Sequence, residues 1–511
     1  MVSVYQLLVE TVQCYGNRVA IVSDEGEEIT YKNLKEKVDF LASAWQIQGM
    51  KKGERIGLML ENSPYYIISY YAAMKLGLVI VQINPNYTLR ELLVIVNDSE
   101  LLYLIVDESN AENGRYTLEM GLLEDIYLTE SIGKQKMTLS SLIEQENQPF
   151  VETSINIEED IAVIQYTGGT TGGIKGAMLT HANLVANVLQ GHKIYEGKMK
   201  YGQELVLIIT PLYHVYAMTC AMNLGVYIAA TNILVKSYRI KETLEKINKY
   251  QPTILPGVPK IYSDIVNYPN VMDYRLDSLK FCTCGSAPIP IEIIKRFENL
   301  TGTIIAEGYG LSEASPTTHR NLPAKNRKIG SIGIPLPNTD SKVVDENGDE
   351  LPIGFIGELI IKGPQVMKGY WKRDRETNDT LKNKWLFTGD LAKQDDEGYF
   401  YIVGRKKELI ITNGFNVYPQ EVENVLFDHP DIKEVAVIGI DDDLKGEIIK
   451  AFIVVHSGAT VNAAELIGYC YKELAPYKVP EKYDFLDYLP RSNVGKVLVK
   501  SLKEMGRDSD N

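Results

Sequence analysis

A glycine- and threonine-rich segment, residues 166–176, carries the chemistry that is easiest to infer from this sequence. It reads Tyr-Thr-Gly-Gly-Thr-Thr-Gly-Gly-Ile-Lys-Gly and follows an apolar run, residues 161–164, that predicts a buried strand. Glycine lets the backbone turn its N–H groups toward a bulky anion. The threonine hydroxyls add donors and Lys175 adds a mobile positive charge, so the segment is suited to holding a polyphosphate.

Two alternatives to that interpretation need weighing. The Walker pattern of P-loop kinases and ATPases requires Gly-Lys-Ser/Thr after four spacer residues, whereas here Ile174 follows Gly173. A P-loop enzyme is therefore disfavoured. The other alternative is a flexible surface loop without a function, and the further motifs of the chain argue against it.

Four later segments contain residues that a nucleotide site would need. They are Gly-Tyr-Gly-Leu-Ser-Glu at 308–313, Thr-Gly-Asp at 388–390, Tyr-Ile-Val-Gly-Arg-Lys-Lys at 401–407 and Gly-Lys at 495–496. Each functional candidate also has an ordinary interpretation. Glu313 is then an acid at a helix start, where the helix dipole favours it. Asp390 is a turn residue, Lys496 an exposed lysine, and His214 a hydrogen-bonded core histidine.

The composition is that of a globular protein with more than one domain. A chain of 511 residues exceeds what one hydrophobic core supports, and its 45% hydrophobic content is ordinary. A formal net charge of −14 argues against nucleic acid as a partner. Five cysteines lack metal-like spacing, and the first residues lack the pattern of a signal peptide. We therefore expect a reducing, cytoplasmic setting.

Residues 205–235 need to be tested as a membrane span, because they contain no charged residue unless His214 is protonated. Pro211, Asn223 and Gly225 interrupt the stretch, and strand-like runs stand at both of its ends. We expect a strand, a loop, a buried helix and a second strand, and no transmembrane segment. Peripheral contact with a membrane and a homodimeric state both stay open.

Strand and helix patterns alternate through the first part of the chain, which predicts parallel sheets covered by helices. The clearest are strands at 56–60, 79–83 and 101–106, and helices at 64–76 and 89–97. Short strands punctuated by glycine and proline then indicate a β-rich subdomain at 330–405. The expected fold class is α/β, with a large N-terminal domain at 1–404, a hinge at 405–408 and a small mobile α+β domain at 409–511.

Taken in order, these motifs resemble those of the acyl-adenylate-forming enzymes, a family that includes acyl-CoA synthetases, firefly luciferase and peptide-synthetase adenylation domains. The resemblance extends from Ile29-Thr30-Tyr31 to Lys496. Residues 84–88 (Asn-Pro-Asn-Tyr-Thr) and 413–419 (Asn-Gly-Phe-Asn-Val-Tyr-Pro) are most similar to fatty-acid and related CoA ligases. The resemblance implies an AMP-forming acid–thiol ligase that uses ATP, Mg²⁺ and CoA.

In that family a carboxylate attacks the α-phosphorus of ATP, pyrophosphate leaves, and the acyl-AMP then transfers its acyl group to CoA. The resemblance implies that Lys175 serves the phosphates, that Glu313 and Thr167 lie at the metal, and that Tyr309 packs on adenine. The nucleotide-binding residues that it implies are Thr167, Gly168, Gly169, Thr170, Thr171, Gly172, Gly285, Ser286, Ala287, Glu307, Gly308, Tyr309, Gly310, Ser312, Asp390, Ile402 and Arg405.

The resemblance also assigns residues to the two half-reactions. Lys496 would stabilise charge on the carboxylate and the α-phosphate during adenylation, for which a mobile ammonium is suited. His214 would lie near the substrate carboxylate. Lys407 would be the hinge about which the small domain rotates, and Gly414 would line the channel through which CoA enters.

Two positions depart from the family pattern, and one segment bears on the substrate. Ile174 stands in place of the usual loop proline and Gly168 in place of the usual serine or threonine, which affects rate and nucleotide affinity more than reaction type. No acid neighbours Tyr213 to pair an α-ammonium, and an unpaired buried ammonium is costly. We therefore expect a medium- or long-chain fatty acid, or an aryl acid, in a pocket near 216–227 and 314–318.

Two other functions stay open beside an acyl-CoA synthetase. One is a ligase that loads an acyl or aryl acid onto the phosphopantetheine of a carrier protein. The other is a non-catalytic nucleotide-binding relative, which the presence of Lys175, Glu313, Asp390 and Lys496 argues against.

Overall fold

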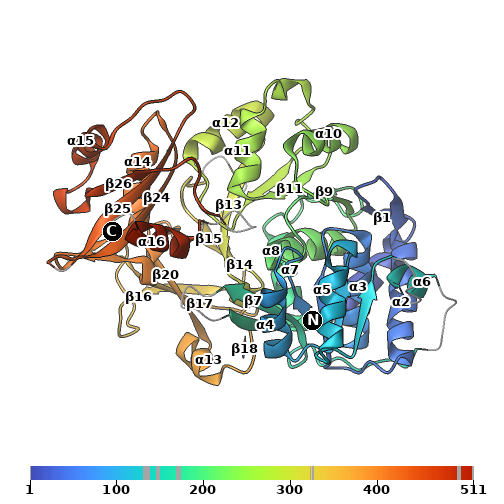
Figure 1. Cartoon of the computed structure of the whole chain (residues 1–511). Helices are drawn as coiled ribbons and strands as arrows, with labels where there is room; N and C mark the ends of the chain where they lie inside the picture. The colour runs from blue at the N-terminus through green and yellow to red at the C-terminus, as the bar shows by residue number, and fades with distance from the viewer. Residues whose placement is uncertain are drawn as a thin grey trace. The chain divides into compact units, whose positions relative to one another are not determined.

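The computed structural model of the chain has a mixed α/β fold (Figure 1). It describes residues 2–130, 138–144, 150–168, 174–322, 324, 327–442, 444–491 and 497–508, and of residues 168, 507 and 508 only the backbone. The described chain divides into two compact units. The first contains Met1–Asp340 and Lys362–Leu386, and the second contains Ser341–Ile361 and Phe387–Asn511.

A nine-stranded sheet in the first unit carries several of the expected site residues. Its strand order is β15-β14-β13-β12-β11-β9-β10-β1-β2. The strands from β13 to β1 run parallel, and β14, β15 and β2 are antiparallel additions. The bounds are β1 Val19–Val22, β2 Glu28–Thr30, β9 Leu205–Ile208, β10 Thr231–Leu234, β11 Ile254–Gly257, β12 Phe281–Cys284, β13 Ile305–Gly310, β14 Thr317–Arg320 and β15 Ile334–Pro335.

A seven-stranded sheet carries the phosphate-loop hairpin. Its order is β18-β8-β7-β4-β3-β5-β6, with β7 to β6 parallel and β8 and β18 antiparallel. The bounds are β3 Arg55–Met59, β4 Val79–Gln82, β5 Tyr103–Val106, β6 Asp125–Leu128, β7 Ile161–Gly168, β8 Ile174–Thr180 and β18 Gly369–Tyr370. The parallel sheets that the alternating pattern predicts are confirmed.

Helices cover these sheets because each buries one apolar stripe against them. The helices α11 and α12 are labelled next to each other in Figure 1. Tyr262 of α11 and Phe297 of α12 pack edge to face in the core of the nine-stranded sheet, with ring centroids 4.9 Å apart. The bounds are α1 Val4–Tyr15, α2 Tyr31–Ile47, α3 Pro64–Leu76, α4 Leu89–Ser99, α5 Ala111–Glu119, α6 Leu139–Ile143, α7 His181–Lys193, α8 Val215–Ala217, α9 Leu224–Tyr227, α10 Ile240–Tyr250, α11 Pro259–Asn267, α12 Ile291–Thr301 and α13 Asp374–Thr380.

The uncharged stretch from 205 to 235 folds as expected into strand, loop, buried helix and strand. Its helical part contains one element that the sequence did not predict, a π-helix, η2 Met218–Asn223, between α8 and α9. Such wide turns are rare and often occur at functional sites. Within the described residues, we find no helix of the length and apolarity that crossing a bilayer requires.

The second unit contains the β-rich segment and the C-terminal α+β fold. One sheet is built from β16 Asp340–Val344, β17 Gly357–Lys362, β19 Leu381–Lys382, β20 Trp385–Gln394 and β21 Phe400–Arg405, of which β19 and parts of β16, β17 and β20 belong to the first unit. The other contains β22 Ile410–Thr412, β23 Phe415–Val417, β24 Ile432–Asp442, β25 Gly446–Val455 and β26 Lys482–Phe485.

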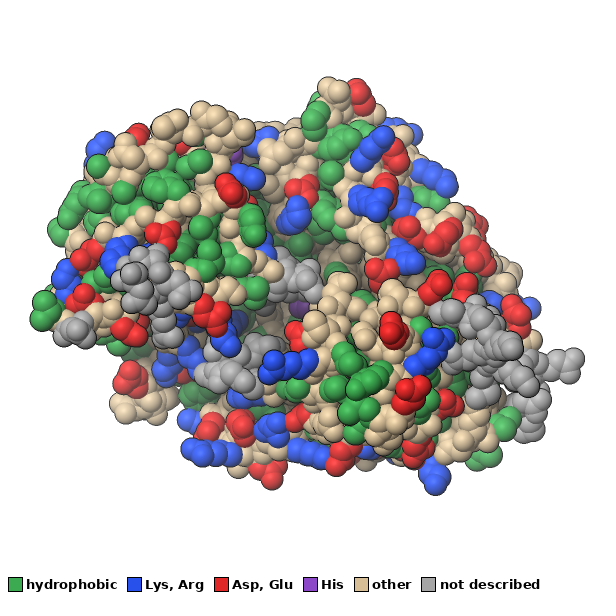
Figure 2. Space-filling view, viewed as in Figure 1, with side chains coloured by type: hydrophobic (Ala, Val, Ile, Leu, Met, Phe, Trp, Pro, Cys, Tyr) green, Lys and Arg blue, Asp and Glu red, His purple; other side chains and the backbone are tan. Residues whose placement is uncertain are grey.

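Helices lie on both faces of this last sheet. Val422 of α14 Pro419–Phe427 and Leu466 of α15 Ala463–Glu473 pack on one face, and Leu502 of α16 Val499–Asp508 packs on the other. Acidic and basic side chains are interspersed over the face of the molecule seen in Figure 2. The remaining short helices are η1 Glu108–Asn110, η3 Val271–Asp273, η4 Ser312–Ala314, η5 Lys406–Glu408 and η6 Pro476–Lys478.

Candidate active site

The β7–β8 hairpin holds the two ends of the glycine-rich loop. Thr167 pairs with Lys175 and Gly168 with Ile174 across the hairpin, and Thr167 Oγ1 donates to the carbonyl oxygen of Lys175 at 3.4 Å. The two residues with functional side chains therefore face each other at the base of the loop. Gly169, Thr170, Thr171 and Gly172 lie outside the described residues.

Tyr370 contacts both Lys175, the lysine of the loop, and Glu313, the expected metal ligand. The Lys175 Nζ lies 5.0 Å from the centroid of the Tyr370 ring, and the Tyr370 hydroxyl donates to Glu313 Oε1 at 2.8 Å. Burial, followed by the nearby Glu313 charge, raises the pKa of Tyr370, so the phenol remains a donor. The sequence analysis missed Tyr370, because only the pairing of β18 with β8, Tyr370 to Ala177, brings it here.

One backbone and one side-chain hydrogen bond fasten the segment before Tyr370 to the segment around Glu313. The Met367 N–H donates to the carbonyl of Glu313 at 2.8 Å, and the Ser315 hydroxyl donates to the carbonyl of Gln365 at 2.9 Å. Ser312 begins the single turn η4 that carries Glu313. The position of the Glu313 carboxylate is thus fixed by two segments that are distant in the sequence.

Tyr309 lies on β13 between Gly308 and Gly310. Tyr309 pairs with His319 of β14, and their rings meet edge to face at 6.1 Å. Successive strand residues point to opposite faces, so Gly308 and Gly310 face away from the Tyr309 ring. A Cβ on Gly310 would lie 2.3 Å from the carbonyl oxygen of Pro316. Only glycine therefore fits at position 310, directly after Tyr309.

The segment after β12 lies beside β13, as the resemblance implies. A Cβ on Gly285 would lie 3.8 Å from the carbonyl oxygen of Gly308 and 3.7 Å from the Tyr216 ring. Ser286 has a positive φ of 75°, and its buried hydroxyl has no hydrogen-bond partner among the described residues. Buried polar atoms are rarely left without a partner. This orphaned hydroxyl, followed by Ala287, therefore fits a wall that is completed by a polar ligand.

His214 is the N-cap of α8, at the strand-to-helix junction that the sequence predicts. Its Nδ1 accepts the Tyr216 N–H at 3.2 Å. Two buried polar residues that sequence reasoning missed fix the preceding loop. Asn62 Oδ1 accepts the Leu212 N–H at 2.8 Å, and the Tyr66 hydroxyl donates to the Leu212 carbonyl at 2.8 Å. In the sequence, only the positions of Asn62 and Tyr66 around the start of an apolar helix hint that they fix this loop.

In the second unit, Asp390 is buried and paired with Arg405. The two residues face each other across β20 and β21, with Arg405 Nε 3.1 Å from Asp390 Oδ1. Thr388 Oγ1 accepts the Asp390 N–H at 3.1 Å and donates to the Leu359 carbonyl at 2.7 Å. A carboxylate has several acceptor sites, so the arginine contact is compatible with a grip on ribose hydroxyls. Ile402 lies on β21.

The predicted hinge and CoA-channel residues lie in turns of the second unit. Lys407 is in the single turn η5, beside Lys406, whose Nζ lies 3.0 Å from Glu358 Oε2. Asn413 and Gly414, with φ of 50° and 78°, form the two-residue turn between β22 and β23. That turn favours Asn-Gly, so it explains the glycine by itself. Lys496 lies outside the described residues, and these three roles stay predictions.

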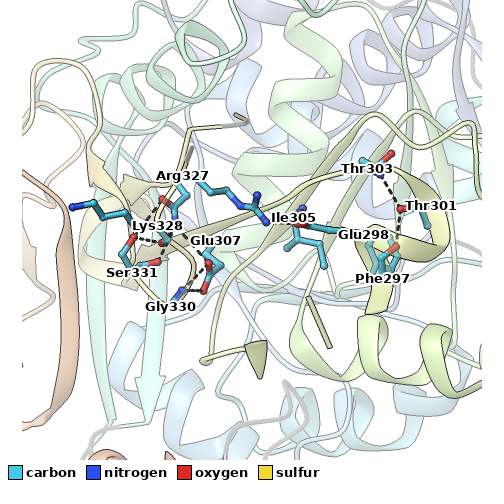
Figure 3. Close-up of polar contacts among 11 residues, drawn as sticks. Phe297, Glu298, Thr301, Thr303, Ile305, Glu307, Arg327, Lys328, Gly330 and Ser331 are labelled. Atoms are coloured by element: carbon cyan, nitrogen blue, oxygen red, sulfur yellow. Dashed lines mark hydrogen bonds and ion pairs between the residues drawn. The ribbon is translucent and has the colours of Figure 1, made fainter. Parts of the chain in front are cut away.

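The Glu307 carboxylate accepts a hydrogen bond from within the protein (Figure 3). Its two oxygens each accept the Gly330 N–H at 3.2 Å, and the nearby Arg327 is paired with Glu298 of α12. Burial raises the pKa of Glu307 to about 7, against the lowering effects of Gly330 and Arg327. The carboxylate thus attaches residues 327–331 to β13. Its place among the nucleotide-binding residues stays a prediction.

The donor set around Glu313 fits a magnesium–nucleotide complex. Mg²⁺ prefers oxygen ligands and is usually held by one or two carboxylates together with substrate phosphates and water. Glu313 supplies a carboxylate, and Lys175 supplies positive charge in the same cluster. Within the part of the chain that the structure describes, no group of three or more His, Cys, Asp or Glu could hold a metal. Phosphate oxygens would have to complete the coordination.

Comparison with known protein families identifies the family of this chain. Residues 8–371 match the model of the family described as AMP-binding enzyme, and residues 421–496 match that of the AMP-binding enzyme C-terminal domain. The chain therefore belongs to the AMP-binding enzyme family.

Individual relatives are similar over almost their whole length. The chain is 39% identical to a long-chain-fatty-acid–CoA ligase of Bacillus subtilis, over 98% of this chain and 93% of that protein. It is 35% identical to the ligase of the same name from Escherichia coli, over 98% and 95%. The ATP-bound structure of MatB from Rhodopseudomonas palustris superposes with a TM-score of 0.91 at 29% identity, covering all of both chains.

Proposed function

We propose that this protein is an AMP-forming acid–CoA ligase that activates a carboxylic acid of the fatty-acid class with ATP and passes the acyl group to CoA. One observation carries the proposal. Tyr370 joins Lys175, at the base of a phosphate-type loop, to Glu313, an acid suited to Mg²⁺. The names of the 39% and 35% identical relatives support the same acid class and CoA as the acceptor.

The first task of such a site is to bring two anions together. A carboxylate and a triphosphate repel each other, so the site has to neutralise charge before they meet. Lys175 would supply positive charge to the β- and γ-phosphates, while the Tyr370 hydroxyl aligns Glu313. Glu313 would hold Mg²⁺, which would supply positive charge against the phosphates. Tyr309 and the Gly285–Ser286 segment would enclose the base. The buried Asp390, paired with Arg405, is suited to accepting hydrogen bonds from ribose hydroxyls.

His214 can orient the acid without exchanging a proton. Because Nδ1 accepts the Tyr216 N–H, the neutral ring carries its proton on Nε2. That N–H is then a donor for one oxygen of the substrate carboxylate and leaves the other oxygen to attack. Lys496 would bridge the carboxylate and the α-phosphate, so that charge developing between them meets an ammonium.

The second half-reaction requires the acceptor thiol to reach the acyl-AMP. We infer that the C-terminal domain rotates about Lys407 after pyrophosphate leaves, which withdraws Lys496 and presents the Asn413–Gly414 turn. A turn that ends in glycine suits the passage of pantetheine. The reaction would take place in the cytoplasm, where ATP and CoA are both available, and the protein could do so as a monomer or as a homodimer.

Pyrophosphate release across a panel of carboxylic acids, with and without CoA, tests the proposal. A ligase releases pyrophosphate with some acids, and the thioester forms when CoA is present. If a phosphopantetheine-loaded carrier protein replaced CoA as the better acceptor, the protein would be a carrier-loading ligase. Binding of ATP without pyrophosphate release from any acid would indicate a non-catalytic relative.

The variant Glu313→Gln examines the metal assignment in the same assay. The amide keeps the size of the side chain and its contact with Tyr370 but removes the anionic ligand. We expect the Mg²⁺ concentration that gives half-maximal pyrophosphate release to rise about tenfold or more, since a carboxylate–metal contact is lost. Glu292→Gln, on the exposed first turn of α12, is the matched control. If Glu313→Gln and Glu292→Gln depended on Mg²⁺ equally, Glu313 would not be a metal ligand.

A further inference from the structure

Asp98, in the last turn of α4, joins three segments of the first unit. Its Oδ2 accepts the Tyr166 hydroxyl at 2.7 Å, and its Oδ1 is 2.5 Å from Arg373 Nη2. The backbone carbonyl of Asp98 accepts the indole N–H of Trp371 at 3.1 Å. Tyr166 belongs to β7, and Trp371 and Arg373 follow β18. One residue therefore connects the end of α4, the loop hairpin and the segment after β18.

These contacts close a ring around the base of the glycine-rich loop. Tyr166 pairs with Gly176 across the β7–β8 hairpin, and the Gly176 carbonyl accepts the Trp371 N–H at 2.8 Å. Tyr166 and Trp371 both return to Asp98 through their side chains. A Cβ on Gly176 would lie 3.2 Å from Tyr166 Cζ, so the tyrosine ring packs directly against the glycine. The ring of contacts holds both strands of the hairpin just before the loop.

The groups that are expected to meet the triphosphate lie directly beside this ring. The next pair of the hairpin is Thr167 with Lys175. On the other side of the ring, Tyr370 directly precedes Trp371, and its hydroxyl bonds to Glu313. A single carboxylate thus positions the loop lysine relative to the expected metal ligand.

The Asp98 carboxylate is suited to this task because it is largely shielded from water. Its side chain is 15% exposed, and each of its oxygens takes one of the two donors. Burial, followed by the Asp98 hydrogen bond, raises the pKa of Tyr166, so the phenol remains a donor. Hydrogen bonds to an ionised group are stronger than neutral ones. An amide at position 98 would turn an N–H toward one of the two donors and lose that contact.

Glu100, two residues further, makes a similar link in contact with water. It pairs with Lys372, and its Oε2 lies 3.6 Å from Arg55 Nη2. The Glu100 side chain is 55% exposed and that of Lys372 is 44% exposed. Exposed ion pairs contribute little to stability. Glu100 therefore joins the same two segments as Asp98 without fixing them.

We propose that Asp98 is a positioning residue for the β- and γ-phosphates of ATP, which holds the loop base and the Tyr370 segment in the relative position that binds a triphosphate. The inference rests on the proposed ligase function and adds to it a residue that does not touch the substrate. AMP and acyl-AMP lack the β- and γ-phosphates, so their binding does not depend on this arrangement. Loss of the Asp98 charge should therefore impair only the half-reaction that uses ATP.

Binding of MgATP and of AMP to Asp98→Asn, measured by calorimetry, tests the proposal without turnover. We expect the Kd of MgATP to rise about tenfold, the effect of one charge-assisted hydrogen bond, and the Kd of AMP to stay within about twofold. The kcat/KM for ATP in pyrophosphate release should fall about tenfold, while thioester formation from supplied acyl-AMP is retained. Arg373→Lys, which keeps a cation, should retain more MgATP affinity than Arg373→Met.

Two other acids provide matched controls. Glu100→Gln removes the exposed link between the same segments. Asp39→Asn, on α2, removes a carboxylate that likewise accepts a tyrosine hydroxyl at 2.7 Å and pairs with a basic side chain. We expect both variants to keep the native ratio of the two Kd values.

Equal changes in the two Kd values of Asp98→Asn, or no change in either, would overturn the positioning role. If Asp98→Asn does not fold, Tyr166→Phe makes the same comparison, because it removes the hydroxyl and leaves the carboxylate. Absence of pyrophosphate release from every acid by the native protein would instead refute the ligase function, while the two Kd values would still decide the role of Asp98.

Discussion

Replacing Glu307 by glutamine should change how the stability of the first unit depends on pH. In the folded protein Glu307 is 8% exposed, and its carboxylate accepts the Gly330 N–H (Figure 3). Burial raises its pKa from the usual 4.5 to about 7. Glutamine keeps the shape and an acceptor for Gly330 but cannot ionise, so it mimics the protonated acid at every pH.

The sign of the effect follows from proton linkage. Between about pH 4.5 and about pH 7, Glu307 is protonated in a larger fraction of folded than of unfolded molecules. The free energy of unfolding therefore falls as the pH rises through this range. Below that window the acid is protonated in both states and the difference vanishes. A shift of about 2.5 pKa units, at roughly 1.36 kcal/mol per unit, corresponds to about 3 kcal/mol lost above pH of about 7. Glu307→Gln should recover that loss.

Tryptophan fluorescence during urea unfolding provides a measurement confined to the right unit. The protein has three tryptophans, Trp45, Trp371 and Trp385, and all of them belong to the first unit. The free energy of unfolding of the native protein and of Glu307→Gln should agree near pH of about 4.5 and diverge by about 3 kcal/mol near pH of about 8.

An exposed acid of the same unit supplies the control. Glu292→Gln on α12 should change stability by less than about 0.5 kcal/mol at any pH. A difference between the native protein and Glu307→Gln that stays constant with pH would show that Glu307 ionises in the fold as it does in water. The burial argument would then be wrong.

Three further changes address the reaction. Tyr370→Phe should lower kcat/KM for pyrophosphate release about tenfold by freeing the Glu313 carboxylate, whereas Tyr238→Phe, which loses an equal 2.8 Å bond to a carboxylate, should not. Lys496→Ala should slow acyl-AMP formation about a hundredfold or more but spare thioester formation from supplied acyl-AMP, and equal loss in both steps would refute its assignment. Lys407→Pro, which fixes φ near roughly −65°, should slow thiolation more than adenylation, and unchanged rates in both would place the hinge elsewhere.

The sequence by itself determined the elements and the chemical class. The apolar run that begins at a proline predicts a helix at 64–76, and it is found as α3 Pro64–Leu76. A glycine such as Gly310 can be recognised in the sequence because a residue with a Cβ does not fit at its position. Local backbone constraints are encoded locally, so motifs read in order were sufficient to indicate the family.

Only the tertiary structure decided which side chains meet. Tyr370 reaches Glu313 and Lys175 through a strand pairing between segments far apart in the chain, and no local pattern announces that pairing. The burial of Arg320 depends on which face of β14 is covered, and the turn after α7 and the helix η2 bring Tyr195 and Cys220 near it. A charge on a strand is ordinary in sequence. It becomes informative only when packing removes water from it.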